Sequence, residues 1–152
     1  MEDIRNILKN KILVLDGAMG TMIQQYKFTE EDYRGEKFKD FKVSVKGNND
    51  MLSITQPKAI REIHGKYLEA GADIIETNTF GANSIAQDDY HMPHLVVEMN
   101  TNAAKLAKVA TKKYSTPDKP RFVAGAIGPT PKTASISPDV NDPGARNVNF
   151  DQ

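Results

Sequence analysis

The sequence predicts an α/β fold with parallel strands, and three observations support this prediction. Runs of apolar residues at 12–15, 72–75 and 122–127 are continuous rather than alternating, as is typical of strands that are covered on both faces. Helical patterns separate these runs, in the order β-α-α-β-α-β. Because crossovers between strands of one sheet are right-handed and return in parallel, we expect about three βα units in one parallel sheet.

The first run, residues 12–15, closes with Asp16-Gly17 and leads into a short helix. Four apolar residues have the i, i+3, i+4, i+7 spacing of one helical face, namely Met19, Met22, Ile23 and Tyr26. We therefore expect an amphipathic helix directly after the first strand.

The second helix is predicted over residues 55–70, with Thr55 as its N-cap and Pro57 in its first turn. Its apolar stripe consists of Ile60, Ile63, Tyr67 and Leu68. Gly71 is expected to end the helix in the left-handed conformation that glycine adopts readily. A strand over residues 72–80 follows, so that helix, glycine and strand form a compact αβ unit.

The third helix is predicted over residues 95–110, and the third strand, at 122–127, follows Pro120. One face of this helix carries Val96, Met99, Ala103, Leu106 and Ala110. Two further segments, 34–52 and 128–149, are long and polar, and loops of that length are usually functional or disordered. Both lie between the carboxyl end of a strand and the next helix, on the face where barrel and open α/β enzymes build their sites.

The composition excludes several classes of protein. Twenty basic and twenty acidic side chains cancel, so no basic excess indicates nucleic acid or a membrane surface as a partner. No apolar run has the length of a bilayer span, and the charged first ten residues lack the apolar stretch of a signal peptide. A cytoplasmic location is therefore expected. Without cysteine, these residues form no disulfide, thiolate nucleophile or Cys-ligated metal site.

The first candidate site consists of Asp16, Gly17 and Ala18, where the first strand ends and a helix starts. Amides at a helix start can hold a carboxylate, and an acidic side chain beside them can hold an ammonium, so the three residues suit the zwitterionic end of an amino acid. The alternative, which the spacing alone favours, is a simple turn in which Asp16 caps the helix. A dinucleotide site is disfavoured because Asp16 stands where the fingerprint needs glycine and would repel a pyrophosphate.

The second candidate is the polar run 76–80 at the carboxyl end of the second strand. Alternate side chains there face the sheet interior and need hydrogen-bond partners, so substrate contacts and ordinary local hydrogen bonds both fit the run. His91 and His94, in a proline-containing loop, are predicted to be exposed loop residues rather than metal ligands. His64 is predicted to be a partly buried packing residue of the second helix.

The end of the sequence carries no closing element. Three parallel strands leave open sheet edges and an unmatched apolar face, and a complete (β/α)8 barrel needs on the order of 200 residues or more. We therefore expect residues 1–152 to be the amino-terminal portion of a larger barrel domain that is not closed within this chain.

Five stretches of the sequence carry a resemblance to one family: ILVLDGAMGTMIQ, KGNNDML, YLEAGADIIETNTFGA, FVAGAIGPT and TASISPDVNDP. From about Ile12 to Gln152, the chain resembles the start of cobalamin-dependent methionine synthase, the 5-methyltetrahydrofolate–homocysteine methyltransferase. The word DGAMGT indicates only the wider homocysteine-methyltransferase superfamily, which includes the betaine-dependent type. The motifs GNND and SISPDVNDP look more specific for the cobalamin enzyme.

The resemblance implies a (β/α)8 TIM-type barrel that binds homocysteine and a zinc ion, which lowers the pKa of the homocysteine thiol. The thiolate takes a methyl group from methylcobalamin, which methyltetrahydrofolate recharges, both on later modules of the full-length chain. By the matching motifs, Asp16 would bind the substrate ammonium, and the amides of Gly17 and Ala18 its carboxylate. Six more residues would line the same mouth, namely Thr77, Asn78, Phe80, Gly128, Pro129 and Thr130.

The zinc ligands of the resembled family are three cysteines, expected downstream of Gln152 together with a glutamate near the substrate amine. The resemblance thus implies that residues 1–152 hold part of the amino-acid pocket but no metal, no bound cofactor and no catalytic residue. Two other classes stay open. A freestanding small-molecule-binding α/β domain would have to close its sheet, for example by pairing with a second copy. A metal-dependent hydrolase could use Asp16, Glu76, His91 and His94; their spacing does not forbid it, although nothing supports it.

Overall fold

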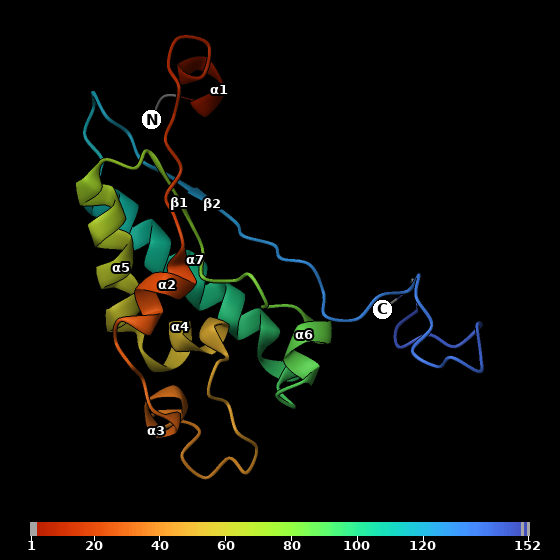
Figure 1. Ribbon diagram of the computed structural model, residues 1–152. Coiled ribbons are helices and arrows are strands. Elements are labelled where there is room, and N and C mark those ends of the chain that lie inside the picture. Colours follow the sequence, from red (N-terminus) through yellow and green to blue (C-terminus); the bar gives the residue numbers. More distant parts are fainter. Residues whose placement is uncertain (1–2, 150, 152) are drawn as a thin grey trace.

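The computed structural model describes residues 3–149 and 151, and Figure 1 shows the strands lying beside a body of helices. Along the chain the elements are α1 (Ile4–Ile7), α2 (Met19–Gln24), α3 (Glu30–Arg34), the 3-10 helix η1 (Asn49–Met51), α4 (Leu52–Thr55), α5 (Pro57–Ala70), β1 (Ile74–Glu76), α6 (Ser84–Asp88), the 3-10 helix η2 (Pro93–Leu95), α7 (Val96–Tyr114) and β2 (Phe122–Ala124). In the described part of the chain, no helix is both long and apolar enough for a membrane span.

The sheet is parallel, as predicted, but its strands are shorter than predicted. β1 pairs in parallel with β2, with Ile74 opposite Phe122. The prediction of a full strand at 12–15 is wrong, because this segment forms only one parallel bridge, between Leu15 and Ile74. Since Ile74 also belongs to β1, the order across the sheet is the Leu15 segment, β1 and β2.

The strands are short because, among the described residues, helices cover the sheet on one face. α5 and α7 pack against β1, and α7 also packs against β2. Away from these helices, Ile12 is 89 % exposed and Ile127 is 93 % exposed. A residue that has neither a hydrogen-bonded partner strand nor a helix packed over it gains little stability from an extended conformation. Sheets of two or three strands depend on packing against helices for their stability. The predicted strands over 72–80 and 122–127 therefore contract to three residues each.

The second predicted helix, α5, begins later than expected, and the prediction of Thr55 as its N-cap is wrong. Pro57 occupies the first helical position and Gln56 is the N-cap. Thr55 instead ends α4, where its hydroxyl donates to the carbonyl of Met51 at 3.4 Å. Proline suits the first position because its missing N–H would have no partner there. Gly71 ends α5 in the left-handed region, at φ 112°, as predicted.

The other two predicted helices are confirmed, whereas four short α-helices among the described residues, α1, α3, α4 and α6, were not predicted. α2 matches the first apolar stripe, and α7 carries the predicted buried face over a longer span than 95–110. Both α3 and α6 have only five residues, too few to show a full apolar repeat. They are recognisable by their caps: Thr29 forms a capping box with Asp32, and the Asn83 side chain accepts from the amide of Ala86.

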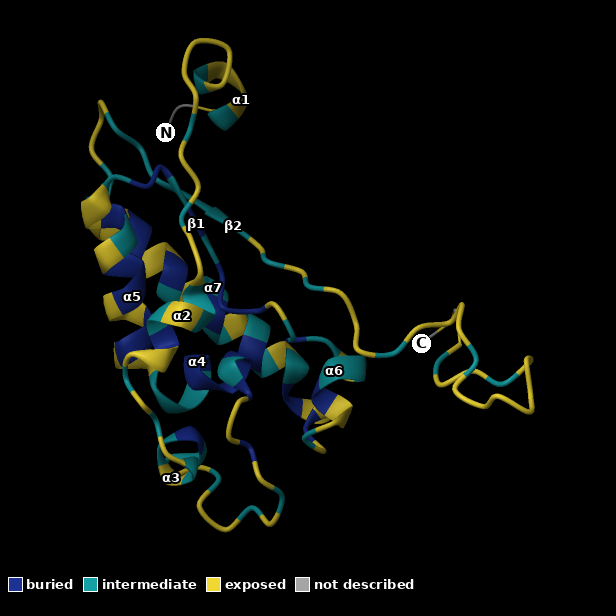
Figure 2. Cartoon of the chain, in the orientation of Figure 1, coloured by how far each residue is buried: buried dark blue, intermediate teal, exposed yellow. Residues whose placement is uncertain are grey.

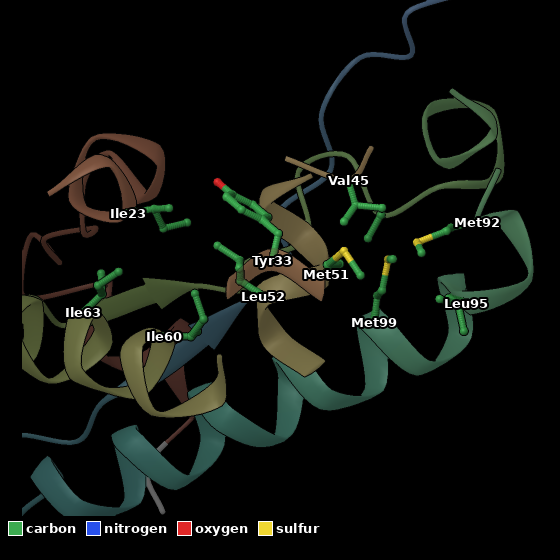
Figure 3. Close-up of a cluster of buried hydrophobic side chains, with 11 residues drawn as sticks. Ile23, Tyr33, Val45, Met51, Leu52, Ile60, Ile63, Met92, Leu95 and Met99 are labelled. Atoms are coloured by element: carbon green, nitrogen blue, oxygen red, sulfur yellow. The ribbon is translucent and has the colours of Figure 1, made fainter. Parts of the chain in front are cut away.

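The main core lies among α2, α3, α4, α5 and α7 (Figure 3). Its buried members are Ile23, Tyr33, Val45, Met51, Leu52, Ile60, Ile63, Ala82, Met92, Leu95 and Met99. A smaller cluster joins the helices to the sheet and consists of Leu68, Ala72, Ile75, Ala107 and Ala110. Figure 2 shows the corresponding buried stripes on α5 and α7. These two clusters fix the carboxyl ends of the strands relative to the loops that follow them.

The long segment 128–149 contains no helix and only one isolated bridge, between Asp139 and Asp142. Figure 2 shows it mostly exposed and extending away from the helical body. Near its start, the Lys132 ammonium lies 3.0 Å from the Asp88 carboxylate of α6. This ion pair joins the beginning of the segment to the last residue of α6.

Glu30 anchors the polar segment that precedes Gly47. Its carboxylate accepts from the backbone amides of Val45 and Lys46, at 2.9 and 2.8 Å, and from the side chains of Arg34 and Ser44, both at 2.8 Å. Partial burial acts to raise the pKa of Glu30, but these hydrogen bonds outweigh it and lower the pKa to about 2. The charged carboxylate therefore stabilises this loop.

We expect Glu30→Ala to lower the free energy of unfolding by about 1–2 kcal/mol, because two backbone amides lose their acceptor. Glu36→Ala is the matched control, since the Glu36 side chain is 96 % exposed. Urea unfolding at pH 7 measures both variants. Because the pKa of Glu30 is lowered on folding, its contribution is present above its ordinary pKa of 4.5 and is lost as pH falls towards 2. Equal losses in the two variants would contradict the anchoring role.

Candidate functional site

Asp16 lies where the Leu15 segment leaves the sheet, and its carboxylate is bound to the neighbouring strand. Both of its oxygens lie 3.1 Å from the backbone nitrogen of Glu76, which donates to them. Burial, and secondarily the nearby Glu76 charge, raise the pKa of Asp16 to about 6, against the effect of this hydrogen bond. The N-cap of α2 is Ala18, which has no side-chain cap. The alternative prediction of Asp16 as a helix cap is therefore wrong.

Gly17 and Ala18 form the exposed turn between Asp16 and α2. The amides of these two residues donate to no acceptor within the described residues. Tyr67 of α5 closes the turn from one side, because its hydroxyl donates to the Ala18 carbonyl at 3.3 Å and its ring would lie 3.4 Å from a Cβ at Gly17. The turn thus presents two N–H donors beside a carboxylate, a combination that suits a zwitterion.

Thr77 is buried and joins the two strands at their carboxyl ends. Its amide donates to the Ala124 carbonyl at 2.9 Å, and its hydroxyl accepts from the amide of Ala126 at 3.1 Å. The same hydroxyl lies 2.6 Å from that of Thr79. Its hydrogen bonds are therefore made within the protein, to Thr79 nearby and to residues at and after the end of β2.

Asn78 holds the GNND loop against the end of β1. Its side-chain amide donates to the carbonyl of Asn49 at 2.7 Å and to the hydroxyl of Ser53 at 3.2 Å. The residue is 5 % exposed. Asn78 thus fixes a loop 29 residues away in sequence at the same edge of the sheet.

Phe80 and Gly128 meet where the chain leaves β1 and β2. The amide of Gly128 donates to the Phe80 carbonyl at 2.9 Å. A Cβ at Gly128 would lie 2.6 Å from that carbonyl oxygen and equally close to the Phe80 ring. Only glycine permits this approach. Pro129 and Thr130 follow on the exposed surface, where the Thr130 hydroxyl donates to the Lys132 carbonyl at 2.7 Å.

A pocket of about 540 Å³ opens at this edge of the sheet. Its walls come from the start of α2, the GNND loop, the residues after β1, α6 with the turn that follows it, and the segment after β2. The lining residues are Met19, Gly20, Gly47, Asn48, Asn49, Asp50, Asn78, Phe80, Gly81, Ala86, Gln87, Asp89, Tyr90, Pro129, Thr130 and Pro131. We call it the rim pocket.

The rim pocket brings together four of the nine predicted site residues, namely Asn78, Phe80, Pro129 and Thr130. The other five, Asp16, Gly17, Ala18, Thr77 and Gly128, do not line it. Asp16, Gly17 and Ala18 directly precede its Met19–Gly20 wall in the sequence. Thr77 and Gly128 hold its strand-end walls in place.

The polar wall formed by Asn48, Asp50 and Gln87 was not predicted from the sequence. The amides of Asn48 and Gln87 form a reciprocal pair, at 2.7 and 3.1 Å, with both side chains 1 % exposed. Asp50 accepts from the amide of Gly81 at 3.0 Å. The word KGNNDML contains two of these residues and a glycine at positive φ, Gly47 at 98°, which is the signal that could have indicated a structured loop.

The histidines take no part in the rim pocket. His91 and His94 are exposed, as predicted, and His64 is completely buried rather than partly buried. No three His, Cys, Asp or Glu side chains come together as a possible metal site anywhere in residues 3–149 and 151. The hydrolase alternative, built on Asp16, Glu76, His91 and His94, therefore has no support from the geometry.

Comparisons with known proteins agree with this architecture. A family model described as homocysteine S-methyltransferase matches residues 13–152. The metallated form of the homocysteine methyltransferase MmuM from Escherichia coli is similar in fold, with a TM-score of 0.63 at 23 % identity over 83 % of this chain and 41 % of that chain. Its oxidised form has a TM-score of 0.63 at 24 % identity over 83 % and 40 %. At this identity the structural likeness shows the fold alone, and the chain spans about two fifths of the length of these proteins.

Proposed function

Because the chain belongs to the homocysteine S-methyltransferase family, we propose that it supplies the first walls of a homocysteine pocket in a methyltransferase of TIM-barrel type. The described strands form part of such a parallel sheet and do not close into a barrel. The pocket lies at the carboxyl ends of the strands, the face on which enzymes of this fold carry their sites.

One observation carries the proposal: an ionisable carboxylate and two N–H donors meet at the strand exit, next to the rim pocket. Asp16 would hold the ammonium of homocysteine, and the amides of Gly17 and Ala18 would hold its carboxylate. The Asp16 oxygens already share the backbone N–H of Glu76, so their position is set before a ligand arrives. In this proposal Phe80, Pro129 and Thr130 enclose the remainder of the substrate.

The residues present do not fit a zinc site. The sequence has no cysteine, and the described residues bring no metal-binding group of side chains together. In our proposal a zinc ion and its three cysteine ligands belong to sequence beyond Gln152, so the present residues bind and orient the amino acid. Reading the coding sequence after Gln152 tests this directly: a stop codon there would contradict it.

Within the family we favour the cobalamin-dependent methionine synthase, whose methyl group comes from methylcobalamin recharged by methyltetrahydrofolate. The support is the GNND motif. Its residues Asn48, Asn49 and Asp50 all line the rim pocket, so the motif that looks more specific for this type belongs to the wall of the proposed substrate pocket. The betaine-dependent type is compatible with the family match and is the second candidate. A methyl-transfer assay of the full-length protein with each donor separates the two.

We expect Asp16→Asn to weaken L-homocysteine binding by about 10- to 100-fold at pH 7, because a charge-assisted hydrogen bond to the ammonium is lost. Asparagine keeps an oxygen that can accept from Glu76, so the fold is retained. Calorimetric or NMR titration measures the affinity. Because the pKa of Asp16 is about 6, binding to the unchanged protein should also weaken as pH falls below 6.

Asp118→Asn is the matched control, since Asp118 is exposed and lies in the turn before β2, at the other end of that strand. It removes the same charge far from the pocket and should leave the affinity within about twofold. If both variants bind L-homocysteine as the unchanged protein does, Asp16 is not the ammonium partner.

A further inference from the structure

Asp50 is a buried carboxylate in the wall of the rim pocket. It lies in η1, is 9 % exposed, and its neighbours Asn49 and Gly81 line the same pocket. The proposed role of Asp16 in binding homocysteine does not involve it.

The carboxylate of Asp50 receives one hydrogen bond from another described residue: Oδ1 accepts from the amide of Gly81 at 3.0 Å. Oδ2 lies 2.8 Å from where a Cβ at Gly81 would be, so a side chain at this position would displace it. The glycine at position 81 therefore leaves room for the second oxygen of the Asp50 carboxylate.

The surroundings of Asp50 supply no compensating positive charge. The lining of the rim pocket contains two carboxylates, Asp50 and Asp89, and neither lysine nor arginine. Burial raises the pKa of Asp50, against the effect of the Gly81 hydrogen bond. Burial, and after it the charges of Asp50 and Asp89, raise the pKa of Tyr90. A buried carboxylate without a cation is costly, so this wall favours a cationic ligand and disfavours an anion.

The wall around Asp50 is fixed before any ligand binds. The side-chain amides of Asn48 and Gln87 donate hydrogen bonds to each other, and the Gln87 side chain also donates to the Gly81 carbonyl at 3.0 Å. Asp50 of η1 thus accepts from the amide of Gly81, and Gln87 of α6 donates to the carbonyl of the same glycine. Because these neighbours already have partners, a further donor for Oδ2 comes from outside the protein, either from water or from a ligand that displaces it in the rim pocket.

We propose that Asp50 is a second ligand-binding carboxylate of this site, which accepts a hydrogen bond from an ammonium or other cationic N–H group of the molecule in the rim pocket. The proposal rests on the proposed function in that it names a further recognition group of the same site. The pocket accordingly selects amino-acid-like molecules with a free ammonium over their N-acylated, anionic counterparts.

Two probes of equal skeleton and opposite charge test the inference. L-methionine amide carries the ammonium and no carboxylate, and N-acetyl-L-methionine carries the carboxylate and no ammonium. We expect the amide to bind the 152-residue chain at pH 7 and to shift the NMR signal of the Gly81 amide, which reports on Asp50 through their shared hydrogen bond. N-acetyl-L-methionine should leave that signal in place. Equal binding of the two probes, or no binding of the amide, would overturn the inference.

Asp50→Asn is the corresponding variant, because asparagine keeps an oxygen for the Gly81 amide and loses the charge. It should weaken L-methionine amide binding by about tenfold or more, whereas Asp118→Asn should leave it within about twofold. The Gly81 shift in the unchanged chain tests the idea even if the variant fails to fold. A folded Asp50→Asn chain with unaltered affinity would make Asp50 a structural residue only.

The outcomes also separate this inference from the proposed function. If L-homocysteine does not bind but the amide binds in an Asp50-dependent way, the proposed function fails and the role of Asp50 stands. If Asp16→Asn weakens homocysteine binding while Asp50→Asn changes neither ligand, the proposed function stands and the role of Asp50 fails.

Discussion

Replacing His64 by leucine is expected to stabilise the protein, by an amount that grows as pH falls. His64 of α5 is completely buried, and neither of its ring nitrogens has a hydrogen-bond partner in the described structure. Burial lowers its pKa from 6.5 to about 4, because the charged imidazole cannot be hydrated there. Leucine has a similar size and no polar atoms, so it removes both unsatisfied groups.

The sign of the pH effect follows from the lowered pKa of His64. Between pH 6.5 and 4 the unfolded chain binds a proton that the folded protein does not, so the contribution of His64 to stability falls as pH falls. The shift corresponds to about 3 kcal/mol. At pH 7 we expect His64→Leu to gain about 1 kcal/mol, and by pH 4 the difference from the unchanged protein should widen by about 3 kcal/mol.

The free energy of unfolding of His64→Leu has to be compared with that of the unchanged protein at each pH, because other groups titrate in the same range. The pKa of Asp16 is raised to about 6, so Asp16 acts in the opposite direction and its contribution to stability rises as pH falls. Subtracting the urea-unfolding free energies of the unchanged protein and the variant at each pH cancels this contribution. His94→Gln, at an exposed position, is the control and should show no such trend. A constant difference from pH 7 to pH 4 would contradict the prediction for His64.

Gly128→Ala is expected to have the second large effect, on the strand exit and on the pocket together. The new Cβ would lie 2.6 Å from the Phe80 carbonyl oxygen. The 64 % exposed Phe80 ring can move aside, but the backbone oxygen cannot move without breaking its hydrogen bond to the Gly128 amide. We expect a stability loss of about 2–3 kcal/mol, the usual cost of overpacking, and faster hydrogen exchange of the Gly128 amide.

Gly125→Ala provides the matched control, because a Cβ at Gly125 would meet nothing within 4 Å. It should leave stability within about 0.5 kcal/mol, since surface substitutions away from special features usually do so. Because Pro129 and Thr130 follow Gly128 in the pocket wall, Gly128→Ala should also weaken ligand binding, whereas Gly125→Ala should not. Identical unfolding curves for the two variants would contradict the close contact between the strand exits.

The parallel arrangement was predictable because it rests on local patterns. Continuous apolar runs and the helical stripes between them indicated β1, β2, α2, α5 and α7, and the expected left-handed Gly71 closes α5. The length of the strands was not predictable, since it depends on which of their residues the helices pack against. Ile12 is as apolar as Ile75, but Ile75 packs beneath α5 and α7 while Ile12 is 89 % exposed.

The candidate site was predictable only in part, and the roles of its nine predicted residues in binding remain predictions. The sequence indicated the correct edge of the sheet, since site residues follow strand ends. It did not indicate which polar groups would already be satisfied. Thr77 has its hydrogen bonds within the protein, whereas Asp50, which no periodic pattern marks, receives one hydrogen bond from another described residue.

The sequence by itself determined the order of α2, α5, β1, α7 and β2, the glycine that ends α5 and the edge at which polar residues collect. These features depend on residues within a few positions of one another. Tertiary structure alone decided which polar groups meet: Asp16 with the Glu76 amide, 60 residues on, and Asn48 with Gln87, 39 residues on. Periodicity carries no information about such pairs, because a hydrogen bond between distant segments depends on where packing brings the chain back.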